Sequence, residues 1–150
     1  MCPLQTKPAD QVPIQLKIKT VIQNDEDKQS FELITFGRYY KKGQSYYLQY
    51  DEVLDEVTVK TIVKVADGNA MILRRGAINM RLPFQLKQKL RGSYETPYGT
   101  LETTTYTKRL AYSFAEDQND GSVEIIYDLS MHGSNAGNYH LNITFKEEKG

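Results

Sequence analysis

Apolar and polar residues alternate along most of the chain with a period of two, which is typical of β-strands that bury one face. In the first alternating segment Ile14, Leu16 and Ile18 share one face, while Gln15 and Lys17 lie on the other. The pattern predicts about nine or ten strands, with clear alternation at residues 14–22, 31–40, 46–50, 57–65, 71–75, 78–84, 100–114, 123–131 and 139–145. The one candidate for a helix is the segment 83–90, and its alternation suits a strand at least as well.

Short segments rich in glycine, asparagine, aspartate and other polar residues separate these strands and predict tight turns. They lie at residues 24–27, 41–44, 51–55, 67–69 and 118–121, and a glycine-rich hairpin loop is predicted at 132–138. The stretch Y-E-T-P-Y-G at 94–99 is interpreted as a barrel corner. Pro97 fixes its own φ and favours an extended Thr96, and Gly99 can take backbone angles that other residues avoid.

Sequential hairpins without long crossovers favour a closed antiparallel up-and-down β-barrel over a β-sandwich, because closure removes the exposed strand edges. The 150 residues suffice for one domain with one core. We expect residues 1–11, which are polar and contain two prolines, to form a flexible tail. Residues 12–150 are expected to form the single barrel domain.

Charge and cysteine content argue against several classes of function. The 19 lysines and arginines balance the 19 aspartates and glutamates, so neither nucleic-acid binding by phosphate neutralisation nor a polybasic membrane anchor is expected. No apolar run reaches the length of a membrane span. The single cysteine, Cys2, allows no intramolecular disulfide, and the first residues lack the apolar region of a secretory signal. We therefore expect a cytoplasmic protein.

No catalytic or metal-binding constellation stands out, so the sequence leans against an enzyme and predicts no cofactor. His132 and His140 could bind a metal only together with a nearby carboxylate, and the strand parity places both on the outer face instead. The paired carboxylates at 51–52 and 55–56 are interpreted as hydrated residues of a polar turn.

Tyrosines and an arginine cluster are the residues best suited to ligand contact. The 11 tyrosines would supply apolar walls and hydroxyls, either to a moderately polar ligand or to a polar packed core. Arg74 shares its strand face with Ile72, and it points into the barrel if that face is inward. If Met71 and Leu73 face inward instead, Arg75 takes that place. An inward arginine needs a carboxylate partner, from a ligand or from a glutamate of the barrel.

Three runs carry a resemblance to a known family: M-I-L-R-R-G-A-I-N-M-R-L-P-F at 71–84, G-S-Y-E-T-P-Y-G-T-L-E-T-T-T at 92–105 and S-V-E-I-I-Y-D-L-S-M at 122–131. They resemble the YwiB-like family of uncharacterised bacterial β-barrel proteins of the calycin (lipocalin-like) type, over residues 12–147. The resemblance implies a closed antiparallel barrel without an assigned activity. Since calycin barrels often hold a small apolar or amphipathic molecule, it also implies an interior binding site.

The leading hypothesis is a barrel that binds a small amphipathic or anionic molecule in its interior. The residues expected to contact this ligand are Arg74, Arg81, Tyr94, Thr96 and Tyr127. The alternative is a structural or protein-interaction barrel with a packed interior, which acts through an exposed sheet face or as a homodimer. Neither hypothesis calls for a metal, nucleic acid or a membrane.

Overall fold

The structure is a computed structural model that describes residues 11–54, 56–115 and 117–148. These residues form ten β-strands and no α-helix, and so include no helix that could cross a membrane. The strands are β1 (Val12–Asn24), β2 (Asp27–Lys42), β3 (Ser45–Leu54), β4 (Val57–Ala66), β5 (Asn69–Gly76), β6 (Asn79–Gln85), β7 (Lys89–Thr96), β8 (Gly99–Ala115), β9 (Asp120–Met131) and β10 (Ser134–Glu147). The predicted tail at 1–11 lies outside the described residues except for Gln11.

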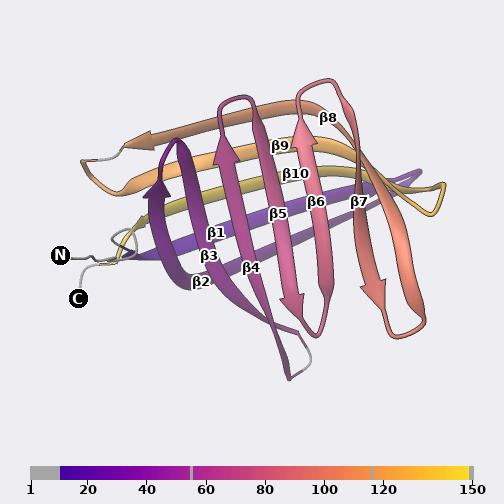
Figure 1. The fold of residues 1–150 in the computed structure, drawn as a ribbon, viewed down its shortest axis with the longest axis horizontal. Helices are drawn as coiled ribbons and strands as arrows, with labels where there is room; N and C mark the ends of the chain where they lie inside the picture. Colours follow the sequence, from indigo (N-terminus) through magenta and orange to yellow (C-terminus); the bar gives the residue numbers. More distant parts are fainter. Residues whose placement is uncertain (1–10, 55, 116, 149–150) are drawn as a thin grey trace.

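Every strand pairs antiparallel with its neighbours in sequence, and β1 also pairs with β10, which closes the ring. The predicted closed up-and-down barrel is therefore confirmed. Figure 1 shows a flattened barrel of two layers, in which β3 to β7 cross in front of the longer strands β1, β2, β9 and β10. β8 passes from one layer to the other at the right of the view.

One end of the barrel is filled by its own side chains. Tyr39, Tyr46, Phe114 and Phe145 pack against each other there, with ring centroids 4.3 Å apart for Tyr46 and Phe114 and 5.1 Å apart for Tyr39 and Phe145. Aliphatic residues from the alternating strands surround these rings and are almost fully buried; they include Ile14, Leu16, Leu48, Val63, Val65, Val123 and Ile125. The period-two pattern of the sequence thus forms the core as predicted.

The stretch at 94–99 forms the tight connection between β7 and β8. Thr96 pairs with Gly99 across a two-residue turn, and the φ of Gly99 is 131°, a value that favours glycine. The Thr96 hydroxyl donates to the Gly99 carbonyl (2.8 Å) and accepts from the Tyr98 amide (3.1 Å). The interpretation of this stretch as a corner between two strands is correct.

Three local predictions need correction. The turn predicted at 51–55 does not include residues 51–54, because β3 runs on to Leu54; Asp55 lies outside the described residues. The segment 83–90 is neither one helix nor one strand, since a turn with Lys87 at φ 60° divides β6 from β7. The loop predicted at 132–138 is shorter, because β10 begins at Ser134 and absorbs the glycine-rich sequence as a β-bulge.

The division of 83–90 marks a bend in the barrel wall. β6 and β7 share only the pairs 79–95, 80–94 and 81–93, and this ladder ends before Pro83, which has no N–H to donate. The Pro83 carbonyl instead accepts from the hydroxyl of Thr105 on β8 (2.6 Å), and the Lys87 amide donates to the Thr107 carbonyl (2.7 Å). The segment between β6 and β7 is therefore held by hydrogen bonds to β8 instead of by a ladder between β6 and β7.

A second irregularity opens the wall between β2 and β3. Their ladder joins residues 37–42 to residues 45–50, whereas residues 27–36 of β2 pair only with β1. Figure 1 shows the two strands diverging from their shared hairpin. Gly37 is the last paired residue before the gap, and a Cβ there would lie 2.1 Å from the Gln49 carbonyl oxygen and 3.0 Å from Tyr50 Cβ. The close approach that ends the gap therefore requires glycine.

Replacement of this glycine should weaken the barrel at the point where the gap closes. Gly37→Ala forces β3 away from β2, and we expect it to lower the free energy of unfolding by about 1–3 kcal/mol. Urea unfolding followed by circular dichroism measures this, with the exposed Arg38→Ala on the same strand as the matched control. Equal stability of the two variants would contradict the steric account.

Candidate functional site

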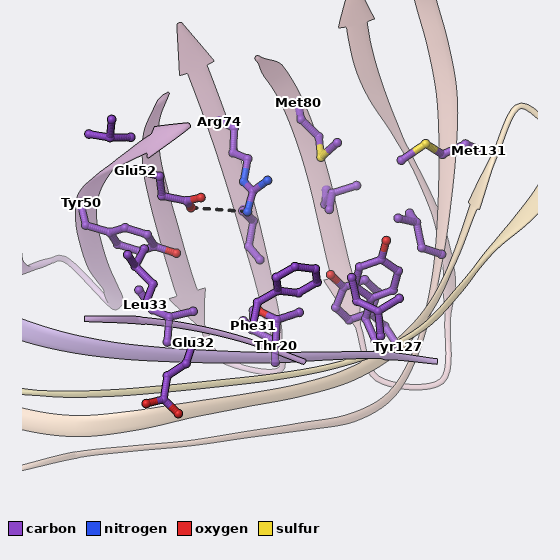
Figure 2. A pocket seen from close by; sticks show the side chains of 18 residues that line it. Thr20, Phe31, Glu32, Leu33, Tyr50, Glu52, Arg74, Met80, Tyr127 and Met131 are labelled. Atoms are coloured by element: carbon purple, nitrogen blue, oxygen red, sulfur yellow. Dashed lines mark hydrogen bonds and ion pairs between the residues drawn. The ribbon is translucent and has the colours of Figure 1, made fainter. Parts of the chain in front are cut away.

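A cavity of about 450 Å³ occupies the end of the barrel that its side chains do not fill. Its walls are mostly apolar and come from strands of both layers, as Figure 2 shows. The apolar lining residues are Ile18, Ile22, Phe31, Leu33, Val53, Ile72, Met80, Leu82, Leu129, Met131 and Leu141. The polar lining residues are Thr20, Glu32, Tyr50, Glu52, Arg74, Tyr127 and Tyr139.

An ion pair between Arg74 of β5 and Glu52 of β3 lies in the wall of the cavity. Nη2 of Arg74 lies 3.4 Å from Oε1 of Glu52, and the hydroxyl of Thr61 donates to the same oxygen at 3.1 Å. The strand register places these groups together, because Thr61 on β4 pairs with both Arg74 and Tyr50. Glu52 follows Tyr50 two residues later and therefore points to the same side of the sheet.

Most N–H donors of the Arg74 guanidinium are not used by other described residues. A guanidinium carries five N–H donors, and among the described residues only Glu52 accepts from this one. The Arg74 side chain is 33% exposed, whereas that of Glu52 is 13% exposed. Figure 2 shows the guanidinium at the edge of the cavity, with the ring of Tyr50 beside the ion pair. The remaining donors can bind an acceptor placed inside the cavity.

Three tyrosines add hydroxyls to the apolar wall. Burial raises the pKa of Tyr50, and the charge of Glu52 raises it further while Arg74 opposes the shift. Burial is also the main cause that raises the pKa of Tyr127 and the pKa of Tyr139. The rings of Tyr127 and Tyr139 stack with their centroids 5.1 Å apart. At neutral pH all three side chains are therefore uncharged and can donate a hydrogen bond.

The mouth of the cavity lies at the gap between β2 and β3. Phe31 of β2 and Val53 of β3 line the cavity and are 55% and 71% exposed. Glu32 also belongs to the lining, but Figure 2 shows its carboxylate pointing away from the cavity, and it lies 3.7 Å from Nζ of Lys17. The mouth is thus apolar, and Arg74 and Glu52 form the charged part of the cavity.

Of the five residues predicted to contact a ligand, the structure brings Arg74 and Tyr127 together in this cavity. Arg81, Tyr94 and Thr96 lie outside its lining. Arg81 is exposed because it alternates with the buried Leu82, and Thr96 serves the turn between β7 and β8. The candidate site therefore does not include these three residues.

The structure also shows which arginine faces inward and what its carboxylate partner is. Ile72 is buried and Arg75 is exposed, so Arg74 is the arginine that faces inward, and a barrel glutamate is its partner. The interpretation of this glutamate, Glu52, as a hydrated turn residue is therefore wrong, because it lies in β3 with a side chain that is mostly buried. Its signal was present in the sequence, since Leu48, Tyr50 and Glu52 continue one alternation.

The histidines lie outside the barrel, as their parity predicts. His132 is exposed in the turn before β10. Nε2 of His140 lies 2.6 Å from a carboxylate oxygen of Glu124, and the other oxygen accepts from Nε of Arg109, also at 2.6 Å. The described residues contain no group of three or more histidine, cysteine, aspartate or glutamate side chains that could hold a metal ion.

Comparison with known proteins assigns this barrel to a family. A family described as a domain of unknown function, DUF1934, matches residues 16–143, and the chain belongs to it. The chain is similar to the uncharacterised β-barrel protein YwiB of Bacillus subtilis (strain 168), with 33% identity over 136 residues, which are 91% of this chain and 94% of YwiB. The crystal structure of YwiB from Bacillus subtilis superimposes with a TM-score of 0.82 at 32% identity and covers 93% of this chain and 94% of that one.

The cluster around Glu124 should make part of the stability depend on pH. Hydrogen bonds from Arg109 and His140 lower the pKa of Glu124 below its usual value. A carboxylate with a lowered folded-state pKa stabilises the fold above its unfolded pKa of about 4.3, and this contribution disappears as the pH falls through the folded pKa. Glu124→Gln should therefore be less stable than the wild type at about pH 7, and this difference should be smaller at about pH 3. Urea unfolding at both pH values, with the outward Glu102→Gln as control, measures the difference; a difference that is constant with pH would contradict the assignment.

Proposed function

We propose that this barrel is a binding protein for a small amphipathic molecule, held in the cavity with its apolar part against the walls and an anionic or acceptor-rich head on Arg74. The observation that carries the proposal is an arginine with unused donors inside a mostly apolar cavity. A volume of about 450 Å³ lies in the range of known small-molecule sites.

The charges around Arg74 restrict the head group of the ligand. Glu52 contacts only one nitrogen of the guanidinium at the long distance of 3.4 Å, so a carboxylate or similar acceptor can bind the other donors. A cationic head would face Arg74 at close range and is disfavoured. The hydroxyls of Tyr50, Tyr127 and Tyr139 can donate further hydrogen bonds to the same ligand.

The apolar walls determine where the rest of the ligand lies. Leucine, isoleucine and methionine side chains line the interior, and burying a hydrocarbon against them gains roughly 25 cal/mol for each Å² removed from water. The exposed Phe31 and Val53 at the mouth provide an apolar entrance. A calycin-like barrel with an interior ligand is part of this proposal, which the closed up-and-down ladder and the hollow end support.

We place this binding activity in the cytoplasm. A single cysteine can form no intramolecular disulfide, and this composition fits a reducing compartment. The proposal calls for neither a metal nor a cofactor.

The proposal is tested with a fluorescent probe that has the expected chemistry. Anilinonaphthalene sulfonate combines an apolar ring system with an anionic head, and we expect one molecule to bind in the cavity with increased fluorescence. Arg74→Met should raise the dissociation constant by about tenfold or more, because a charge-assisted hydrogen bond is lost. Arg81→Met, which removes an exposed arginine from the neighbouring strand β6, is the matched control and should leave binding unchanged.

A second variant keeps the test decisive if Arg74→Met disturbs the fold. Met131→Trp fills the cavity from β9 and should abolish probe binding without removing any charge. Native mass spectrometry of the protein purified from its own source should in addition show a retained small molecule. Probe binding that neither variant changes would overturn the proposed site.

A further inference from the structure

The residues of β2 beside the gap form a strand edge that no other strand of the described residues covers. This segment, residues 27–36, is called the free edge of β2; it pairs with β1 on one side and not with β3 on the other. Within the part of the chain that the structure describes, one hydrogen bond crosses the gap there, from the Thr35 hydroxyl to the Asp51 carbonyl at 3.4 Å. The free edge thus has backbone groups available for pairing.

The register shows which backbone groups these are. Two-residue turns join Asn24 to Asp27 and Lys42 to Ser45, so the odd-numbered residues of β2 bond β1, and Lys42, Tyr40 and Arg38 bond β3. By the same alternation, the N–H and C=O groups of the remaining even-numbered residues point into the gap. These residues are Lys28, Ser30, Glu32, Ile34 and Phe36.

The free edge lacks two of the usual features that prevent strand addition, a proline and a β-bulge, although it does carry charged residues. It contains no proline, and its ladder with β1 runs without a bulge. Its side chains include Phe31, Ile34 and Phe36, which are 55%, 59% and 59% exposed. Regularly spaced N–H and C=O groups with apolar flanks are complementary to another extended polypeptide.

We propose that the free edge of β2 is a dimer interface, on which the same edge of a second copy of this chain adds antiparallel about a two-fold axis. The charges select the register. Among the even-numbered residues of the free edge only Lys28 and Glu32 are charged, and a two-fold axis at Ser30 places each Lys28 opposite Glu32 of the partner subunit. An axis at Glu32 would instead oppose two carboxylates.

The geometry of this register agrees with the free backbone groups. Even-numbered residues face even-numbered ones, so the groups that point into the gap bond each other as hydrogen-bonded pairs. The Glu32 carboxylate is available for the new ion pair, because its contact with Lys17 is 3.7 Å long and both side chains are more than half exposed. Each two-fold pair of edges thus gains two ion pairs as well as backbone hydrogen bonds.

The dimer has a consequence for the cavity, although it does not depend on ligand binding. Phe31 and Leu33 of the free edge line the cavity mouth, so the added strand would run along that mouth. In the register centred on Ser30 the partner's Gln29 lies opposite Phe31. The second copy would therefore form one side of the entrance.

Charge exchange tests both the interface and its register. We expect the ligand-free wild type to sediment as a dimer at micromolar concentrations in analytical ultracentrifugation. Lys28→Glu alone and Glu32→Lys alone each oppose like charges twice and should raise the dimer dissociation constant by about tenfold. The double variant Lys28→Glu with Glu32→Lys restores opposite charges and should restore the dimer.

Two further variants separate the edge from general effects of charge and folding. Lys60→Glu makes the same change on β4, a strand covered on both sides, and should not affect the dimer. Ser30→Pro removes an N–H that points into the gap and should give a folded monomer, with the fold checked by circular dichroism. A monomeric wild type, single variants that remain dimeric, or a double variant that stays monomeric would each overturn the proposal.

Discussion

The ion pair between Arg74 and Glu52 determines which end of the barrel interior is packed and which end is hollow. Two charges on inward-facing positions cannot be enclosed by aliphatic side chains without a large loss of hydration. Tight packing is therefore confined to the end that holds the aromatic cluster around Phe114, and the end that holds the ion pair stays hollow and partly open. The same pair keeps the hydroxyl of Tyr50 beside charged groups in a mostly apolar wall.

The hollow end and the gap between β2 and β3 belong to one arrangement. β3 approaches β2 closely at Gly37 and leaves it beyond Tyr50, so Glu52 sits on the part of β3 that has separated from β2. This separation admits solvent to the ion pair and leaves the backbone of β2 uncovered. One local divergence thus accounts for the cavity mouth, the partial exposure of Arg74 and the free edge.

Alternation along the chain was enough to predict the barrel, because each strand has a buried face and each hairpin is short. It also narrowed the inward arginine to Arg74 or Arg75, a choice that needed only the burial of Ile72. Glu52 was missed because the acidic sequence from Asp51 to Glu56 resembles a turn, although β3 continues through its first four residues. Parity gives the direction of a side chain but not the distance to the opposite wall. The sequence therefore could not show that a cavity exists, nor that Arg81, Tyr94 and Thr96 do not line it.

The pairing of β1 with β10 has a further consequence for how the chain reaches its native state. Ile14 lies opposite Glu147, so the contact that closes the ring joins nearly the two ends of the described chain. Nine hairpin-type ladders can form between neighbours in sequence, but the ring remains an open sheet until the last strand docks on the first. Contacts of such high sequence separation form late and slowly, because the loop entropy is lost before the contact stabilises anything. During synthesis the edge of β1 that pairs with β10 therefore remains unpaired until β10 has left the ribosome.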